Sequence, residues 1–265
     1  MTASVPGVLE TTLRGRRAEG RKLLVPYITG GLDGWTEAIA AAVIAGADAL
    51  EVGIPFSDPV MDGPVIQEAS QRALDAGITP MAIIDAISRL DVSVPVAVMT
   101  YYNTVFRAGH ERFARALAAA GIAAAIVPDL PLEESGEWCL VADDAGVETV
   151  MLAAPTAPDE RLPRICARAR GFVYAVGLLG VTGERAKLAS TAVEMARRLK
   201  AVTDVPVLVG VGVSNAAQAV ETCRVADGVI QGASVVRRLM DGGPEAVGAY
   251  VHEVRLALDG VGGQS

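Results

Sequence analysis

Three carboxylates lie close together in the segment from Leu50 to Gln67, which reads LEVGIPFSDPVMDGPVIQ. Glu51 stands inside an apolar run typical of a β-strand, and Asp58 and Asp62 follow in a segment rich in proline and glycine. An acid buried on a strand is costly unless it is paired or serves as a proton donor. A second acid on the loop beyond the strand could complete acid–base catalysis across a bound substrate. The alternative is an aspartate-rich turn beside a strand glutamate whose charge is compensated.

The composition limits other kinds of chemistry. The two histidines, His110 and His252, are far apart and have no acid at metal-ligand spacing, so we expect no metal site. None of the lysines (Lys22, Lys187 and Lys200) falls within a strand-like run, where a Schiff-base amine would be held in a dry pocket. A nucleophilic set of serine or cysteine with histidine has no support either. Of the catalytic strategies considered, only direct acid–base chemistry by carboxylates is left.

Charge, hydropathy and cysteine content indicate the cellular compartment of the protein and the partners that it lacks. A net charge of −8 argues against a nucleic-acid partner. The longest uncharged apolar runs fall well short of the roughly 20 residues that a membrane helix needs. The N-terminal region carries several arginines where a signal peptide would have its apolar core. The three cysteines are an odd number and widely spaced. We therefore expect a cytoplasmic protein with reduced cysteines and no membrane partner.

Apolar runs of strand character alternate with amphipathic helical segments along the chain. Strands are predicted at residues 23–29, 49–54, 94–101, 123–127, 148–153, 172–176, 207–211 and 228–232. Helices are predicted at 35–45, 64–75, 111–120, 133–144, 159–168, 190–201, 215–222 and 234–258, the last broken near 242–244, with further helices at about 8–19 and 80–89.

The strand runs are continuously apolar, which indicates a parallel sheet covered by helices on both faces. The predicted fold is α/β: residues 1–265 form one domain, a single (β/α)8 TIM barrel. It carries an extra N-terminal helix and an extra helix between strands 2 and 3. An open, doubly wound sheet is the main alternative.

Three glycine-containing loops follow predicted strands 6, 7 and 8, namely Gly180-Val-Thr-Gly183, Gly210-Val-Gly212 and Gly232-Ala-Ser234. In a barrel these loops lie near one another at the carboxyl ends of the strands, where barrels of this type commonly bind phosphate. Glycine allows the backbone to approach a ligand, and the amides at a helix N-terminus favour an anion. The glycines could also be ordinary turn residues. A phosphate on one side and two acids on the other suggest cleavage or rearrangement of a phosphorylated small molecule.

Over nearly its whole length the chain resembles the tryptophan synthase alpha subunit family. The matching motifs are LEVGIPFSDPVMDGPVIQ, the Tyr102-Asn103-Thr-Val-Phe106 loop, Pro128-Asp-Leu-Pro131, Gly180-Val-Thr-Gly183 and Gly210-Val-Gly212. The resemblance implies an enzyme of tryptophan biosynthesis, a lyase. Its reaction would be the reversible retro-aldol cleavage of indole-3-glycerol phosphate to indole and glyceraldehyde 3-phosphate.

The resemblance also implies roles for individual residues. Glu51 would protonate indole C3 and take the proton from the glycerol hydroxyl, Asp62 would accept the indole N–H, and Tyr174 would position the substrate and Glu51. We expect a raised pKa for Glu51 in its apolar setting, whereas Asp62 on its loop should stay solvated and ionised until closure. The binding residues implied are Tyr27, Met99 and Tyr101 for the indole, and Thr182, Gly183, Gly212, Gly232, Ala233 and Ser234 for the phosphate.

Members of this family work with a β subunit, and the resemblance implies the same partner here. That subunit carries pyridoxal phosphate and joins indole to serine, so an α2β2 assembly is expected and no cofactor is expected in this chain. The segment Gly180–Ser190 would be a lid, since its glycines permit the backbone change. The residues that match partner contacts are Ser57, Asp58, Pro59 and Pro131.

The chain departs from the family pattern in two places. Gly232-Ala233-Ser234 stands where the family usually has Gly-Ser-Ala, so one hydroxyl bond to the phosphate is lost unless Ser234 reaches it. Val176-Gly-Leu-Leu179 stands where polar residues are more frequent, which bears on lid closure. Three functions stay open: the α subunit of the synthase, a stand-alone lyase that releases free indole, and a weakly catalytic module that activates a β-type partner.

Overall fold

Eight parallel strands close into a barrel in the order β1 to β8. The computed structural model describes residues 5–177, 185–210 and 212–262. β1 pairs in parallel with both β2 and β8, so the sheet has no edge and the open doubly wound alternative is excluded. The strands are β1 (Leu23–Thr29), β2 (Leu50–Gly53), β3 (Val96–Met99), β4 (Ala124–Ile126), β5 (Glu148–Ala153), β6 (Val173–Ala175), β7 (Val207–Val209) and β8 (Gly228–Gln231).

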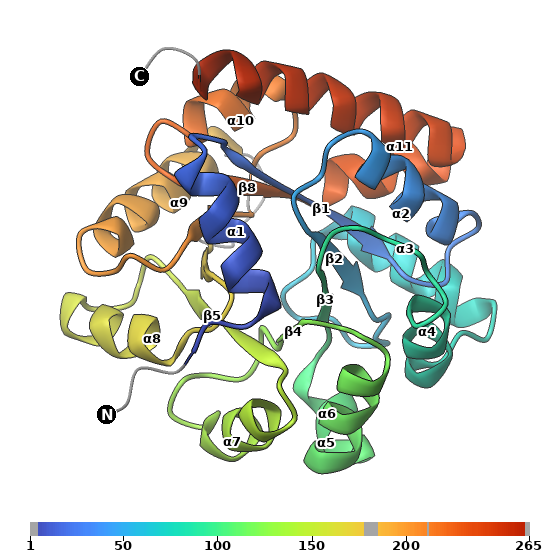
Figure 1. The fold of residues 1–265 in the computed structure, drawn as a ribbon. Helices are drawn as coiled ribbons and strands as arrows, with labels where there is room; N and C mark the ends of the chain where they lie inside the picture. The colour runs from blue at the N-terminus through green and yellow to red at the C-terminus, as the bar shows by residue number, and fades with distance from the viewer. Residues whose placement is uncertain (1–4, 178–184, 211, 263–265) are drawn as a thin grey trace.

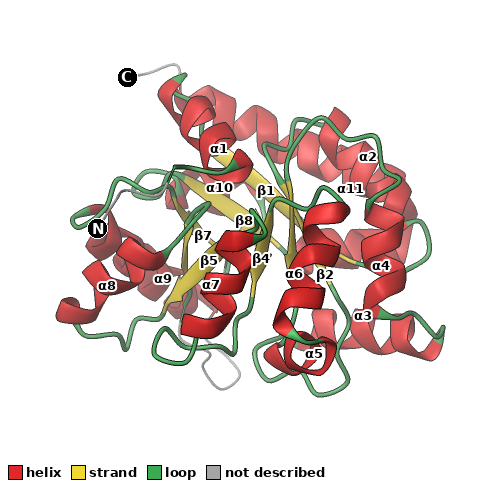
Figure 2. Ribbon diagram, turned by 60° about the horizontal axis from the view of Figure 1, so that its bottom comes forward, coloured by secondary structure: helices red, strands yellow, loops and turns green. Residues whose placement is uncertain are grey.

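Helices surround the strands on the outside of the barrel, as Figure 2 shows. Both extra helices predicted from the sequence are present: α1 precedes β1, and α4 lies between β2 and β3 in addition to α3. The (β/α)8 barrel is thus confirmed. The helices are α1 (Val8–Ala18), α2 (Trp35–Ile44), α3 (Pro64–Asp75), α4 (Pro80–Ile87), α5 (Tyr102–Ala108), α6 (His110–Ala119), α7 (Gly136–Asp144), η1 (Asp159–Arg161), α8 (Leu162–Arg168), α9 (Arg185–Lys200), α10 (Ala216–Thr222) and α11 (Ala233–Gly262).

Several elements differ from the sequence prediction at their ends. β1 and β5 have the predicted bounds, and the other strands are shorter, because their outer residues leave the sheet to begin loops. The Tyr102–Phe106 segment was expected to be a loop, but it lies in α5, where a carboxylate oxygen of Asp129 accepts the Tyr102 N–H at 2.8 Å. The predicted break in the last helix is confirmed, since Gly243 interrupts α11 with a φ of 71° just before Pro244.

Helix α1 covers the amino-terminal end of the barrel (Figure 1). Glu148, the first residue of β5, accepts the backbone N–H of Leu9 at 2.6 Å and of Glu10 at 3.0 Å. A carboxylate at a helix N-terminus satisfies free amides and complements the helix dipole. Farther along α1, Arg14 and Arg17 pair with Asp204, which precedes β7. With this end covered, the carboxyl ends of the strands are left for a binding site.

The buried apolar side chains form one cluster that runs through the barrel and under the helices, with Phe113 and Phe172 among the largest fully buried ones. Cys139, Cys166 and Cys223 belong to this cluster and are unpaired, as the sequence predicts. Burial of this kind is the main favourable contribution to folding.

Candidate active site

Glu51 lies on β2 with its side chain inside the barrel. It is 1% exposed, and its neighbours in register are Tyr27 on β1 and Ala97 on β3. Its Oε2 atom is buried without a hydrogen-bond partner among the residues that the structure describes. Burial raises the pKa of Glu51 to about 8, and the nearby charge of Asp62 adds to the shift. The raised pKa expected from the sequence is therefore confirmed, and Glu51 is protonated at neutral pH, as a proton donor must be.

Asp62 lies in the loop between β2 and α3 and is only partly exposed. The Tyr101 hydroxyl donates to Asp62 Oδ2 at 3.1 Å and accepts the backbone N–H of Met61 at 3.0 Å. These two bonds tie the loop to Tyr101, and Asp62 is half-buried in the structure instead of fully solvated, as the sequence had led us to expect. Burial raises the pKa of Asp62, while the hydrogen bond from Tyr101 lowers it and partly offsets that shift.

Two phenols, of Tyr27 and Tyr174, occupy the barrel interior beside glycines of neighbouring strands. A Cβ atom at Gly53 would lie 1.9 Å from the Tyr27 hydroxyl oxygen, and one at Gly210 would lie 2.0 Å from that of Tyr174. Any side chain at either glycine would displace the adjacent ring. Sequence reasoning did not single out Gly53, and it took Gly210 as a phosphate-loop residue. The available signal was a glycine at an inward position of an apolar strand run.

Tyr174 on β6 is electrostatically coupled to the acid pair. Burial raises its pKa well above the ordinary value, and the negative charge of Glu51 raises it further. The phenol is therefore protonated at neutral pH and can act as a hydrogen-bond donor inside the barrel. This placement agrees with the positioning role expected from the sequence.

Met99 and Tyr101 lie on the same side of the barrel as the acids. Met99 ends β3 in register with Gly53, and Tyr101 is the residue that precedes α5. The Tyr101 ring stacks on Phe56, with ring centroids 5.0 Å apart. Tyr101 was predicted as an indole contact, and its hydroxyl has the additional task of holding Asp62.

The described part of the predicted phosphate site comprises the ends of β7 and β8. Gly212 has a φ of 84°, the left-handed region that favours glycine, and Ala233 is the first residue of α11, directly after Gly232. The amides at this helix N-terminus are suited to an anion. Ser234 Oγ accepts a hydrogen bond from the Tyr250 hydroxyl at 3.1 Å, a contact between two residues of α11. Leu178, Leu179 and residues 180–184 of the predicted lid, Thr182 and Gly183 among them, lie outside the described residues, and the rest of the predicted lid segment belongs to α9.

Replacing Ala233 with serine is expected to tighten phosphate binding. Ala233 has no side-chain hydrogen-bond donor, so a hydroxyl at this exposed position adds one donor next to the amides at the start of α11. A hydrogen bond to a charged group contributes about 1.5–3 kcal/mol, so the dissociation constant of glycerol phosphate should fall roughly tenfold or more. Calorimetric titration of wild type and Ala233→Ser measures this. An unchanged affinity would mean that Ser234 or water already makes the contact.

The predicted partner-contact residues lie on exposed loops at the carboxyl end of the barrel. Ser57, Asp58 and Pro131 are exposed, and Pro59 is partly exposed. Two apolar side chains of the same end are unusually exposed, Val60 at 72% and Phe106 at 66%. The sequence did not predict their exposure, because that depends on how the loop and α5 pack.

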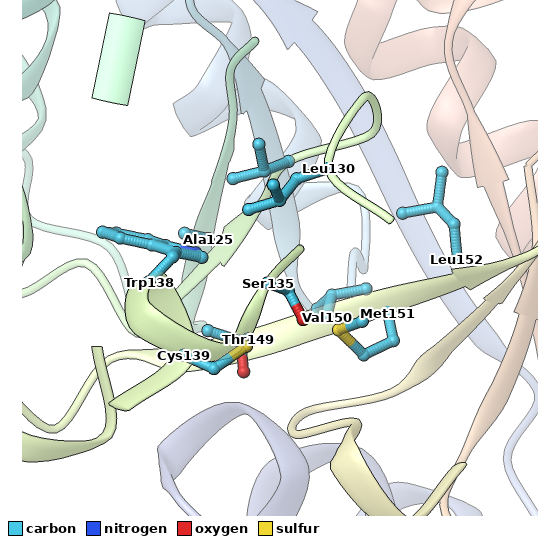
Figure 3. A pocket seen from close by; sticks show the side chains of 10 residues that line it. Ala125, Leu130, Ser135, Trp138, Cys139, Thr149, Val150, Met151 and Leu152 are labelled. Carbon is cyan, nitrogen blue, oxygen red and sulfur yellow. The ribbon is translucent and has the colours of Figure 1, made fainter. Parts of the chain in front are cut away.

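A small pocket lies outside the barrel interior, between the sheet and α7 (Figure 3). Its lining is mostly apolar, with two hydroxyls and one thiol and no acid, base or histidine: Ala125, Val127, Leu130, Ser135, Trp138, Cys139, Thr149, Val150, Met151 and Leu152. It lacks the groups that acid–base chemistry needs.

The described part of the chain contains neither a metal site nor a membrane-spanning helix. No group of three or more His, Cys, Asp and Glu side chains there could hold a metal ion. Nor does any helix in the described ranges combine the length and apolar character needed to cross a membrane.

Known proteins are similar to this chain in sequence and in fold. The family model described as tryptophan synthase alpha chain matches residues 13–256. The tryptophan synthase alpha chain of Streptomyces coelicolor is 46% identical over 97% of this chain and 98% of its own length. The tryptophan synthase alpha chain of Thermobifida fusca is 45% identical over 88% of this chain and 89% of its own length.

Solved structures agree with these relatives. A chain of Mycobacterium tuberculosis tryptophan synthase superposes with a TM-score of 0.88 at 37% identity, covering 96% of this chain and 99% of that one. The tryptophan synthase subunit alpha of Legionella pneumophila gives a TM-score of 0.86 at 32% identity, and the superposition covers 97% of this chain and 100% of that one. The resemblance drawn from the motifs is therefore confirmed, and this chain belongs to the tryptophan synthase alpha chain family.

Proposed function

We propose that this protein is the α subunit of a tryptophan synthase, a lyase that cleaves indole-3-glycerol phosphate to indole and glyceraldehyde 3-phosphate. The observation that carries the proposal is the acid pair. Glu51 is buried with a pKa of about 8, and Asp62 is held across the barrel mouth by Tyr101. Two carboxylates in different environments can take opposite roles in one reaction. The whole chain, residues 1–265, acts as one domain.

Proton transfer at the indole ring begins the proposed reaction. Glu51 gives its proton to C3, which converts the ring to a cationic indolenine, and Asp62 accepts the hydrogen bond of the ring N–H and stabilises that positive charge. The glycerol hydroxyl next to C3 then loses its proton to the Glu51 carboxylate. Its oxygen forms the carbonyl of glyceraldehyde 3-phosphate, and the carbon–carbon electron pair returns to the ring to give indole.

The other residues bind and orient the substrate. Tyr174 donates toward Glu51, while Tyr27, Met99 and Tyr101 contact the indole. At the opposite side of the mouth the amides of Gly212, Gly232 and Ala233 hold the phosphate, together with Thr182, Gly183 and Ser234. Because these donors are uncharged amides and hydroxyls, the acidic chain binds a phosphate without a lysine or arginine cluster.

The proposed partner is a β subunit that carries pyridoxal phosphate and converts indole and serine to tryptophan in an α2β2 assembly. The exposed apolar side chains of Val60 and Phe106, beside Ser57, Asp58, Pro59 and Pro131, support a protein contact at this end of the barrel. The cofactor belongs to the partner and none is assigned to this chain. We place the protein in the cytoplasm with the rest of such a pathway.

Indole release from indole-3-glycerol phosphate tests the proposed function. The purified chain is assayed alone and with a tryptophan synthase β subunit. Slow turnover that rises strongly with the partner supports the α-subunit assignment. Fast turnover that ignores the partner identifies a stand-alone lyase instead. Absence of turnover combined with activation of the partner identifies a non-catalytic activating module.

The pH dependence of the lyase reaction is expected to fall off on the alkaline side. Burial raises the pKa of Glu51 to about 8, so the proton needed at indole C3 is present at neutral pH and is lost as the pH passes about 8. The profile of kcat/KM for the free enzyme should show this limb. Activity that stays level up to pH 10 would contradict proton donation by Glu51.

A further inference from the structure

The long last helix, α11, changes direction at its break. Gly243 interrupts the helix with a φ of 71°, and Pro244, which follows, has no N–H to continue the hydrogen-bond pattern. The Pro244 ring packs against the start of α2, where a Cβ atom at Gly34 would lie 3.0 Å from it. α11 as a whole lies beside α2 (Figure 1). The break allows the part of α11 after Gly243 to contact the first turn of the same helix.

A hydrogen bond between two hydroxyls joins these two parts of α11. The Tyr250 hydroxyl donates to Ser234 Oγ at 3.1 Å, although the two residues are 16 positions apart. In a straight helix this separation would span about 24 Å, so the bond depends on the break at Gly243. Tyr250 is buried, and Ser234 is the second residue of α11, directly after Ala233. A buried phenol therefore holds the first turn, where the predicted phosphate site lies.

Arg238 adds two further contacts to this pair. Its guanidinium donates to the Ser234 carbonyl oxygen at 2.9 Å, and its Cζ lies 3.6 Å from the centroid of the Tyr250 ring. A cation over an aromatic face is attracted to the ring. Burial raises the pKa of Tyr250, while the hydrogen bond with Ser234 and the charge of Arg238 lower it and partly offset that shift. The phenol is therefore protonated at neutral pH, as a donor must be.

We propose that Tyr250 is a positioning residue of the phosphate site, because its hydroxyl holds Ser234 so that the free amides of the first turn of α11 stay directed at the anion. The first amides of a helix have no acceptor within the helix, and helix ends fray. Here Tyr250 holds the side chain of Ser234 and Arg238 holds its carbonyl, which leaves its N–H for a ligand. A first turn that is ordered before binding reduces the entropy that the ligand must overcome.

The inference rests on the proposed function, since it concerns the phosphate group of that substrate. It also gives a role to the order Gly232-Ala233-Ser234. Ala233 is exposed and offers only its amide, whereas the hydroxyl of Ser234 has a partner within the protein. The alternative is a contact that stabilises the fold and does nothing for the ligand. The two readings differ in the affinity for phosphate.

The test uses Tyr250→Phe and Ser234→Ala, alone and combined. Tyr250→Phe removes one oxygen atom and keeps the ring beside Arg238. Calorimetric titration with glycerol phosphate and with inorganic phosphate measures the dissociation constants, and Tyr250→Phe should raise both about fivefold. Because the two substitutions break the same bond, the double variant should bind no more weakly than the weaker-binding single variant.

Tyr102→Phe is the matched control for these titrations. The Tyr102 hydroxyl contacts His110 Nε2 at 3.1 Å, so its loss should leave both dissociation constants unchanged. Thermal unfolding of all variants verifies the fold. In the indole assay, Tyr250→Phe should raise KM for indole-3-glycerol phosphate by a similar factor and leave kcat nearly unchanged, because the phosphate is held equally in the ground state and the transition state.

The phosphate affinities decide the inference separately from the proposed function. An unchanged affinity in Tyr250→Phe, or an equal further loss when this change is added to Ser234→Ala, would overturn the inference and reduce Tyr250 to a packing residue. A loss confined to kcat would overturn it as well. If the wild type binds glycerol phosphate but forms no indole, the proposed lyase function fails, and the titrations still decide the role of Tyr250. If the wild type binds neither phosphate compound, the inference fails together with the proposed phosphate site.

Discussion

Replacing Glu51 with glutamine is expected to abolish indole formation from indole-3-glycerol phosphate. The change removes the only proton that the buried side chain can give to C3, and loss of a general acid–base typically costs ~10²–10⁴ in rate. Substrate binding should persist, because the amide keeps the shape of the acid. Steady-state indole assays and calorimetric titration with substrate separate the two effects. The matched control is Glu111→Gln, which alters an exposed glutamate paired with Arg115 and should keep full activity.

The same variant should be more stable than the wild type at alkaline pH. The pKa of Glu51 is about 8 in the folded chain against an ordinary value of 4.5, so the folded chain keeps a proton that the unfolded chain loses. Wild-type stability therefore falls as the pH rises between these values, by on the order of 3 kcal/mol at pH 7. Urea unfolding of wild type and variant at pH 4 and pH 8 measures how the free energy of unfolding of each protein changes with pH. Retained turnover would contradict proton donation by Glu51, and a variant less stable than the wild type at pH 8 would contradict the burial of a protonated Glu51.

Replacing Asp62 with asparagine is expected to lower kcat by roughly 10²–10³-fold while KM changes little. The loss arises because the anion stabilises the cationic indolenine, which exists only after C3 is protonated, and preorganised charge of this kind is worth about that factor. The Tyr101 hydroxyl can still donate to the remaining side-chain oxygen, so the loop should keep its position.

Asp85→Asn is the control for this variant, since it changes an exposed helical aspartate paired with Arg89. The crucial comparison is between kcat and KM. An Asp62→Asn enzyme with a raised KM and normal kcat would show that Asp62 only binds the ground state. The electrostatic role assigned to it would then be wrong.

The barrel and Glu51 could be predicted because each depends on local sequence. Continuous apolar runs specify a parallel sheet, and an acid within such a run is buried wherever the sheet closes. The long segment around Glu51 and Asp62 also identified the family, as the comparisons confirmed. The assigned catalytic and binding roles stay predictions that the variants above test.

Other parts of the site depend on contacts between distant segments and could not be predicted. The exposure of Asp62 is set by Tyr101, which lies 39 positions away. Ser234, which was predicted to bind the phosphate, also accepts a hydrogen bond from Tyr250, a residue 16 positions along the same helix. Gly53 looked like an ordinary strand residue until the Tyr27 phenol was found in its side-chain space. No periodicity encodes such pairings.

The most direct test of the central claim is the exchange of the C3 hydrogen of indole in D₂O with and without Glu51. In the reverse direction of the proposed reaction, with indole and glyceraldehyde 3-phosphate, Glu51 removes the C3 proton and later returns one from solvent, so deuterium should enter C3. Mass spectrometry of the indole reads this, and the same mixture without protein corrects for spontaneous exchange. Deuterium at C3 with the wild type, and none above the blank with Glu51→Gln, is the expected result. Equal labelling by Glu51→Gln would show that another group protonates C3, and would contradict the account.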